Sequence, residues 1–188
     1  AADSKSAGGN TVRVRVSLPA PLVWLSVWRV LQADTASGAL TNPASGVHVK
    51  ILIAADGSKY TKQAINYLIT HSDQFGVQPE IRLINVHHPL PGRAAAALGK
   101  SVIAKFYAEE ADKATAEARN ILDKAGLKYS ESNLVGDAGT LIAAQAAKGN
   151  FDLVVMGSHG HSSLSNLVLG SVATKVLSQC KVPVLIIR

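Results

Sequence analysis

From His48 to the C-terminus, short apolar runs alternate with longer stretches in which apolar residues recur at helical spacing. Four of these runs are rich in β-branched residues and end at turn residues, as buried strands do. They are residues 49–54, 81–86, 151–156 and 182–187. Residues 129–135 form a fifth and more polar run, and this polarity is typical of a strand at the edge of a sheet. The alternation therefore predicts βαβ units and a parallel sheet.

The longer stretches predict four helices. The expected bounds are an N-cap at Ser58 for the first, Ile103 to Ala125 with Gly126 beyond for the second, and N-caps at Asp137 and Ser171 for the third and fourth. In the second helix, Phe106 belongs to the apolar stripe that would face the core. Because crossovers between parallel strands are right-handed, these elements predict an α/β fold with an open five-stranded parallel sheet and helices on both faces.

Residues 1–46 differ from the rest of the chain and hold both of its tryptophans. An apolar run behind two arginines is loosely similar to a secretory signal, but Pro19, Pro21 and Arg29 interrupt it. We therefore expect an N-terminal extension that is disordered or non-native. The remaining residues, 47–188, form a single predicted domain.

Composition narrows the classes of function. Hydrophobic residues make up 47% of the chain but aromatic residues only 5%, so an aliphatic core is expected. The net charge of +6 is spread out, and no basic run with interleaved aromatic residues suggests nucleic-acid binding. Cys180 is the only cysteine, which excludes an intrachain disulfide and fits a reducing, cytoplasmic compartment. Arg29 keeps the apolar stretch around it short of the roughly 18 residues that a membrane-spanning helix needs.

A glycine-patterned loop follows the strand that ends at Met156. Its pattern is Gly157-x2-Gly160-x9-Gly170-Ser171. Backbone N–H groups hold phosphate oxygens best where no Cβ intervenes, and glycine permits that approach. Since Gly170-Ser171 lies where the fourth helix starts, its free N–H donors would face an anion. The loop therefore predicts a phosphate-binding site.

Three segments of this chain resemble the universal stress protein family. They are residues 51–58, residues 154–160 and residues 182–186. The resemblance extends from His48 to Arg188, and the full glycine spacing is similar to that of the ATP-binding branch. It implies a Rossmann-like fold, similar to adenine nucleotide alpha hydrolases, with strand order 3-2-1-4-5. It also implies a homodimer that forms through the C-terminal edge strand.

The same resemblance implies which residues bind the nucleotide. Asp56 matches the acidic residue that contacts it, Val86 matches a position along the adenine, and the glycine loop matches the phosphate and ribose contacts. The implied set is Ala54, Ala55, Asp56, Val86, Met156, Gly157, Ser158, His159, Gly160, Gly170, Ser171 and Val172. In open α/β sheets, ligands bind where the winding direction reverses, here between the first and fourth predicted strands. Without the resemblance, Asp56 is more often a turn or cap residue.

Residues 94–101 offer a competing phosphate site, because they fit a relaxed P-loop pattern that ends in Gly99-Lys100-Ser101. A P-loop follows directly from a buried strand, whereas this segment follows two prolines and is rich in alanine. We predict a mobile linker that leads into the second helix.

The histidines at His87-His88 and His159-x-His161 raise the question of a metal site. No further cysteine, histidine or carboxylate falls at ligand spacing, so loop histidines are the simpler interpretation, and His159 could donate to a phosphate. Mg²⁺ or Mn²⁺ would arrive on the oxygens of the nucleotide itself.

The sequence shows no nucleophile with an adjacent base, so efficient catalysis is not predicted and no catalytic residue is assigned. Three hypotheses follow: a nucleotide-dependent regulatory module in stress response, a slow ATPase on the same site, or a dimeric interaction protein in which nucleotide is only structural.

Overall fold

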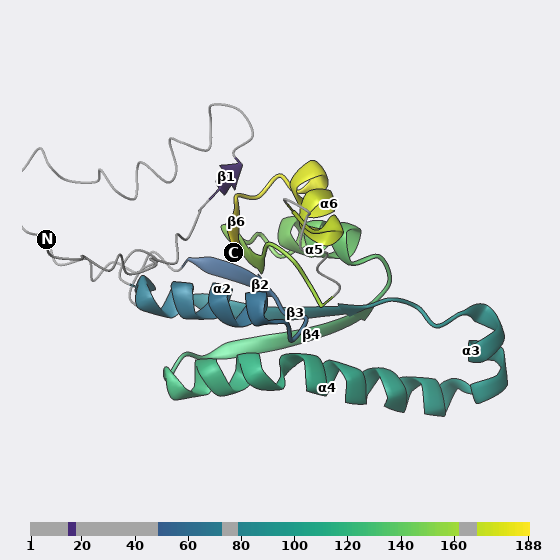
Figure 1. Ribbon diagram of the computed structural model, residues 1–188. Coiled ribbons are helices and arrows are strands. Elements are labelled where there is room, and N and C mark those ends of the chain that lie inside the picture. The colour runs from purple at the N-terminus through teal and green to yellow at the C-terminus, as the bar shows by residue number, and fades with distance from the viewer. Residues whose placement is uncertain (1–14, 18–48, 73–78, 162–168) are drawn as a thin grey trace, which may run out of the picture.

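A six-stranded sheet forms the centre of the computed structural model, which describes residues 15–17, 49–72, 79–161 and 169–188 (Figure 1). The strands are β1 (Arg15–Ser17), β2 (Lys50–Ala54), β3 (Glu80–His87), β4 (Tyr129–Val135), β5 (Leu153–Gly157) and β6 (Val184–Ile187). The helices are α2 (Lys59–Thr70), α3 (Gly92–Leu98), α4 (Lys100–Lys124), α5 (Ala138–Lys148) and α6 (Ser171–Gln179). All five predicted strands and all four predicted helices are present.

The strand order is β1-β6-β5-β2-β3-β4. Its five parallel strands confirm the predicted order 3-2-1-4-5, and the polar strand β4 lies at one edge as expected. In the middle of the sheet, Ile51 of β2 pairs with Ile81 of β3 on one side and with Leu153 of β5 on the other. The chain therefore winds outward in both directions from β2, and the reversal between β2 and β5 opens a crevice at their carboxyl ends.

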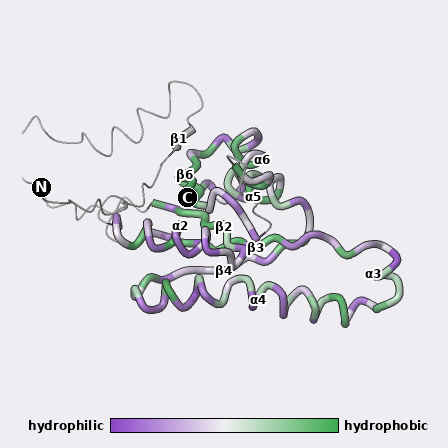
Figure 2. Tube along the Cα trace, viewed as in Figure 1, coloured by the Kyte–Doolittle hydropathy of each residue, from purple (hydrophilic) through white to green (hydrophobic). Residues whose placement is uncertain are grey.

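Helices α2 and α4 cover one face of the sheet, and α5 and α6 cover the other (Figure 1). Successive side chains of β2 point to opposite faces, so Ile51 packs with Ile65 of α2, while Leu52 packs with Val176 of α6. Figure 2 shows hydrophobic and hydrophilic residues alternating along α4, as expected of a helix with one covered face.

Local sequence signals set several helix ends. Ser58 is the N-cap of α2 and accepts a hydrogen bond from the Thr61 N–H. Asp137 caps α5 in the same way through the Thr140 N–H. Gly126 follows the end of α4 with a φ of 68°, a conformation that glycine adopts without steric cost. These three predictions are confirmed.

The segment that resembles a P-loop is helical, so the prediction of a mobile linker is wrong. Gly92–Leu98 forms α3, and Gly99, with a φ of 73°, separates it from α4, which begins at Lys100. Alanine has the highest helix propensity, and Pro91 lies at the N-cap, where proline does not disrupt a helix.

The first half of α4 extends with α3 beyond the ends of the strands (Figure 1). For this reason Phe106, which was expected to face the core, is 40% exposed. The buried positions of α4 lie further along the helix, at Ala111, Thr115, Ala118 and Leu122.

The strand β6 does not form a free edge, contrary to expectation. Arg15–Ser17 pairs with it in antiparallel register, with Val16 opposite Leu185. Only these three residues of the predicted extension are described, and the rest of residues 1–46 lies outside the described part of the chain. Among the described residues, no helix has the length and apolar character needed to cross a membrane.

Candidate functional site

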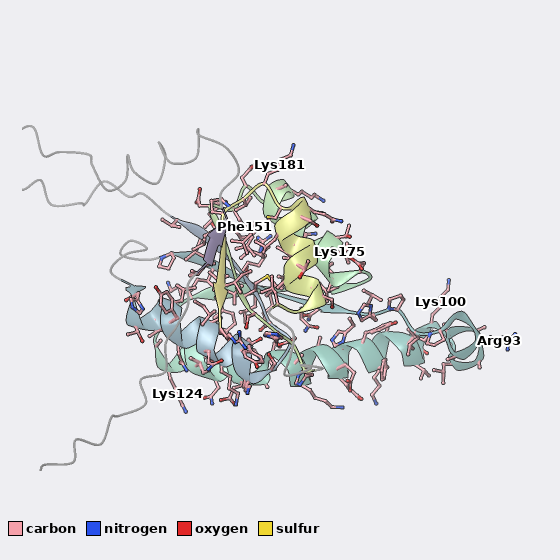
Figure 3. The ribbon with its side chains drawn as sticks, turned by 45° about the horizontal axis from the view of Figure 1, so that its top comes forward. Arg93, Lys100, Lys124, Phe151, Lys175 and Lys181 are labelled. Carbon is pink, nitrogen blue, oxygen red and sulfur yellow. The ribbon has the colours of Figure 1, made fainter. Side chains whose placement is uncertain are left out.

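A cavity of about 680 Å³ lies at the carboxyl ends of β2 and β5. This volume falls within the range of roughly 300–1,000 Å³ that is common for small-molecule sites. The sequence-predicted site residues that line it are Ala54, Ala55, Asp56, Val86, Met156, Gly157, Ser158, His159, Gly160, Gly170, Ser171 and Val172. The fold thus brings all twelve into one cavity, although they come from four separate parts of the chain. Lys100 does not line this cavity, and Figure 3 shows it near Arg93, where α3 meets α4.

One part of the cavity is apolar. Val86 and Ile84 occupy the same face of β3, because they are two residues apart on a strand. Met156 comes from β5, and Ala138 and Ile142 come from the first turns of α5. These side chains present a surface suited to the flat face of an aromatic ring.

Asp56 is held in place by the start of α2. Its Oδ1 accepts hydrogen bonds from the Ser58 N–H at 2.9 Å and from the Thr61 hydroxyl at 2.7 Å. Its Oδ2 lies on the Gly160 side, because a Cβ built on Gly160 would come within 2.8 Å of that oxygen. The carboxylate is therefore both a turn residue, as its own sequence context suggested, and a lining residue of the cavity.

Ser158, the residue after β5, connects the glycine loop to β6 and α6 through hydrogen bonds. The Ser158 N–H donates to the carbonyl of Ile187 at 2.7 Å, and its carbonyl accepts from the Gly170 N–H at 2.8 Å. Its side chain is buried, and Oγ lies 3.0 Å from Nδ1 of His159. The main chain of the loop is thus fixed at the end of β6 and at the start of α6.

The N-terminus of α6 opens into the cavity without a side-chain cap. Ser171 was expected to cap this helix, but Gly170 occupies the N-cap position and makes no side-chain hydrogen bond. The first turn also holds no acidic residue. Because the first N–H groups of a helix have no partner within it, α6 presents free donors and a partial positive charge to the cavity.

By contrast, the neighbouring helix α5 has its N-terminus neutralised. The Asp137 carboxylate accepts from the Thr140 N–H at 2.9 Å and lies 3.0 Å from the Lys175 ammonium. These contacts lower the pKa of Asp137 to about 2, and the hydrogen bond from the Thr140 backbone has the largest effect. The difference between α5 and α6 directs an anion to α6.

The three glycines of the loop are required for close approach, not for unusual backbone angles. None has a positive φ. A Cβ on Gly157 would meet Tyr60 Cβ at 2.5 Å, and one on Gly170 would meet the Ser158 carbonyl at 3.1 Å. Gly160 alone faces a cavity side chain, Asp56. The expectation that Gly157 makes room for phosphate is therefore revised: its missing Cβ makes room for α2.

Comparison with known proteins agrees with this architecture. Residues 49–188, three quarters of the chain, match the universal stress protein family. The chain belongs to the universal stress protein family. A relative from Methanocaldococcus jannaschii is 29% identical over 143 residues, which cover 76% of this chain and 83% of the relative.

Solved structures of universal stress proteins share the fold. UspA from Lactobacillus plantarum superposes with a TM-score of 0.62 at 19% identity, covering 75% of this chain and 98% of that one. A protein from Archaeoglobus fulgidus gives a TM-score of 0.56 at 22% identity, covering 76% and 100%. At these identities, the likeness establishes the fold alone.

Two histidines of the glycine loop, His159 and His161, make specific contacts in this universal stress protein. His159 is only 8% exposed, and its ring lies 5.3 Å from that of Tyr60. His161 Nε2 donates to the Asp56 carbonyl at 2.7 Å, which links the glycine loop to the end of β2. Within the described ranges, no three histidine, cysteine or carboxylate side chains converge on a possible metal position.

Several residues of the cavity were missed by sequence reasoning. They are Thr61, Ile84, His88, Ala138, Ile142, His161 and Ala173. Two signals could have found some of them: the two-residue period of β3, which groups Ile84 with Val86, and the first helical turns, which place Ala138 and Ala173 beside their caps. No sequence signal near His161 or near Asp56 indicates the long-range contact between these two residues.

Proposed function

We propose that this universal stress protein binds an adenine nucleotide, ATP, in the cavity between β2 and β5. The observation that carries the proposal is the uncapped N-terminus of α6, which faces the same space as the glycine loop and the apolar surface of Val86 and Met156. Donors at one end and apolar side chains at the other match a molecule with a phosphate tail and an aromatic base.

Two structural relatives support an adenine nucleotide as the ligand. A universal stress protein has been crystallised in complex with cAMP, and one from Archaeoglobus fulgidus in complex with dAMP. They are 22% and 23% identical to this chain, with TM-scores of 0.54 and 0.51. In our proposal, the base lies along Val86, and the phosphates reach the backbone of Gly160, Gly170 and Ser171.

Asp56 has a defined part in this proposal. Since Ser58 and Thr61 already occupy its Oδ1, Oδ2 is the oxygen that would accept a hydrogen bond from the nucleoside. Among the described residues that line the cavity it is also the only carboxylate, so the phosphates meet little competing negative charge.

The proposed role is regulatory, as a nucleotide-dependent module in stress response. Ser158 Oγ lies 3.0 Å from His159 Nδ1 in the lining, but the serine side chain is only 2% exposed, so we do not propose it as a nucleophile. The described residues do not fit a resident metal ion either, since no three ligating side chains converge. Mg²⁺ or Mn²⁺ would be carried by the phosphates.

We place the protein in the cytoplasm, because its single cysteine, Cys180, precludes an intrachain disulfide.

We also propose a homodimer that forms through the β6 edge. In such a dimer β1 would have to leave its place beside Leu185, because one edge cannot pair with two strands at once.

The deciding experiment has two steps. The protein is purified and denatured, and mass spectrometry of the supernatant should detect an adenine nucleotide. Titration with Mg-ATP then compares the wild type with Gly160→Val, which should abolish binding by crowding Asp56, and with Lys100→Ala, which should leave it unchanged. Binding lost in Lys100→Ala and kept in Gly160→Val would refute the proposed site.

A further inference from the structure

A second cavity, of about 410 Å³, lies on the α4 side of the sheet. It is bounded by the turn after β2, the end of β3 and the middle of α4. The residues that matter here are Asp56, Asn85, His87, Glu110, Lys113 and His161. Among the residues of β3, Asn85 and His87 line only this cavity, Ile84 lines only the first, and Val86 lines both.

Asn85, which lines this cavity, has a buried polar atom without a partner. The side chain is only 3% exposed, and its Nδ2 donates to the Ala55 carbonyl at 2.7 Å. This bond fixes the orientation of the amide, yet Oδ1 has no hydrogen-bond partner. A buried acceptor without a partner has lost its hydrogen bonds to water without replacement, so such atoms are rare in folded proteins.

A second unpartnered atom lies two residues further along β3. His87 Nε2 is buried and makes no hydrogen bond. Within the described part of the chain only Gln63 Oε1 shares this condition, and Gln63 does not line the cavity. Two of these three atoms therefore belong to residues that line one 410 Å³ space, which indicates that a ligand completes their hydrogen bonding.

The charges around the cavity restrict the ligand. Asp56 and Glu110 are carboxylates, and Lys113 is the single ammonium among the lining residues. Glu110 Oε1 accepts from Lys113 Nζ at 2.7 Å, so these two charges offset each other. The remaining carboxylate makes the cavity unfavourable for an anion. The free Asn85 Oδ1 requires a donor.

We propose that this second cavity binds a small molecule that donates hydrogen bonds, an amine or a polyol, to Asn85 Oδ1 and His87 Nε2. The site adjoins the proposed nucleotide site and shares Asp56, Val86, His88 and His161 with it. It stands without the nucleotide, because neither unpartnered atom belongs to a residue of the first cavity.

Three probes with the same carbon skeleton test the chemistry. Labelled full-length protein is titrated with 1,3-diaminopropane, 1,3-propanediol and malonate while the side-chain NMR signals of Asn85 and His87 are followed. We expect saturable shifts with the diamine, the diol or both, and none with malonate. Saturation by one of the first two alone identifies the source of the donors. Saturation by malonate alone would mean that the cavity binds an anion, and saturation by no probe would mean that water fills it. Either result would overturn the proposal.

Two variants and a control locate the site. His87→Phe keeps a ring beside Tyr107 but removes Nε2, and should weaken binding of the effective probe about threefold to tenfold. His71→Phe, on α2 and outside the cavity, should bind like the wild type. Lys113→Met frees Glu110 and should tighten the diamine about threefold or more. Equal affinities in all four proteins would overturn the proposal even if His87→Phe folds poorly, because Lys113 is exposed and its variant should fold.

Discussion

The Thr61 hydroxyl donates a 2.7 Å hydrogen bond to Asp56 Oδ1, so the first turn of α2 holds the carboxylate that lines the proposed nucleotide cavity. The Asp56 N–H donates back to Thr61 Oγ1 at 3.3 Å, which closes the turn. Asp56 therefore enters the cavity already oriented, with one oxygen engaged and the other directed toward Gly160.

Removing this hydroxyl should weaken nucleotide binding. Thr61→Val keeps the side-chain shape, and we expect ATP affinity to fall about threefold to tenfold because Asp56 loses its orientation. Isothermal titration calorimetry measures the change. Thr70→Val, which removes an exposed hydroxyl from the other end of α2, is the matched control and should bind normally. An unchanged affinity in Thr61→Val would show that Asp56 does not need this support.

Two glycines of the loop should separate stability from binding. Gly157→Ala forces a Cβ against Tyr60 and should lower the free energy of unfolding by about 1–3 kcal/mol. Gly160→Ala meets only Asp56 Oδ2, so it should reduce ATP affinity with little effect on stability. Urea denaturation and ATP titration measure the two quantities. Gly92→Ala, which has open space around it, should change neither. A stable Gly157→Ala protein would contradict the packing argument.

A carboxylate at the start of α6 should stabilise the fold and oppose the ligand. Ser171→Asp places a negative charge in a first turn that has none, which should add about 0.3–1 kcal/mol to stability. The same charge should repel phosphate and lower ATP affinity at least tenfold. Ser178→Asp, in the last turn of α6, should instead lower stability slightly and leave binding unchanged. If Ser171→Asp binds ATP normally, the phosphates do not lie at this helix end.

Asp137 should contribute a pH-dependent part of the stability. Its pKa is lowered from 3.8 to about 2, so the folded state favours the ionised form. The stabilisation is therefore complete above pH 4 and is lost as the pH falls toward 2. Denaturation series between pH 5 and 2 should show a shallower slope for Asp137→Asn. Lys175→Met should give an intermediate slope, because the larger effect of the Thr140 backbone remains. Identical slopes in all three proteins would contradict this assignment.

The pairing of β1 with β6 should limit dimerisation. Proline at Val16 removes a backbone donor and disfavours a ladder, so Val16→Pro should release the β6 edge. We expect light scattering at micromolar concentration to show a larger dimer fraction than in the wild type. Val16→Thr, which keeps a β-branched residue, is the control. A monomer in all three proteins would remove the dimer from the proposal.

Local signals in the sequence were enough for much of the fold. Ser58 and Asp137 predicted their helices because capping depends on residues a few positions away. The alternation of apolar runs with helical stretches predicted a parallel sheet, while the strand order 3-2-1-4-5 was implied by the family resemblance. The glycine loop was recognised from its own pattern, whereas Ala54, Asp56 and Val86 were assigned only through the family resemblance, since Asp56 by itself is an ordinary turn residue.

What the sequence did not predict depends on contacts between distant segments. The hydrogen bond from His161 to Asp56 spans 105 residues. The pairing of Val16 with Leu185 is made by main-chain groups, which every residue except proline offers. Phe106 follows the helical period, yet it is 40% exposed because α4 is longer than the strands it covers. The length of the strands is not encoded near Phe106.

Ser158 uses both of its main-chain groups at once, toward Ile187 on one side and toward Gly170 on the other. A movement of the loop that followed a bound phosphate would therefore pull on the last strand and on α6 together. Such a movement would act on the edge of β6 that pairs with β5, whereas β1 pairs with the opposite edge. Ligand binding in the cavity and the release of β1 from β6 would then be mechanically linked, and either event could be detected by observing the other.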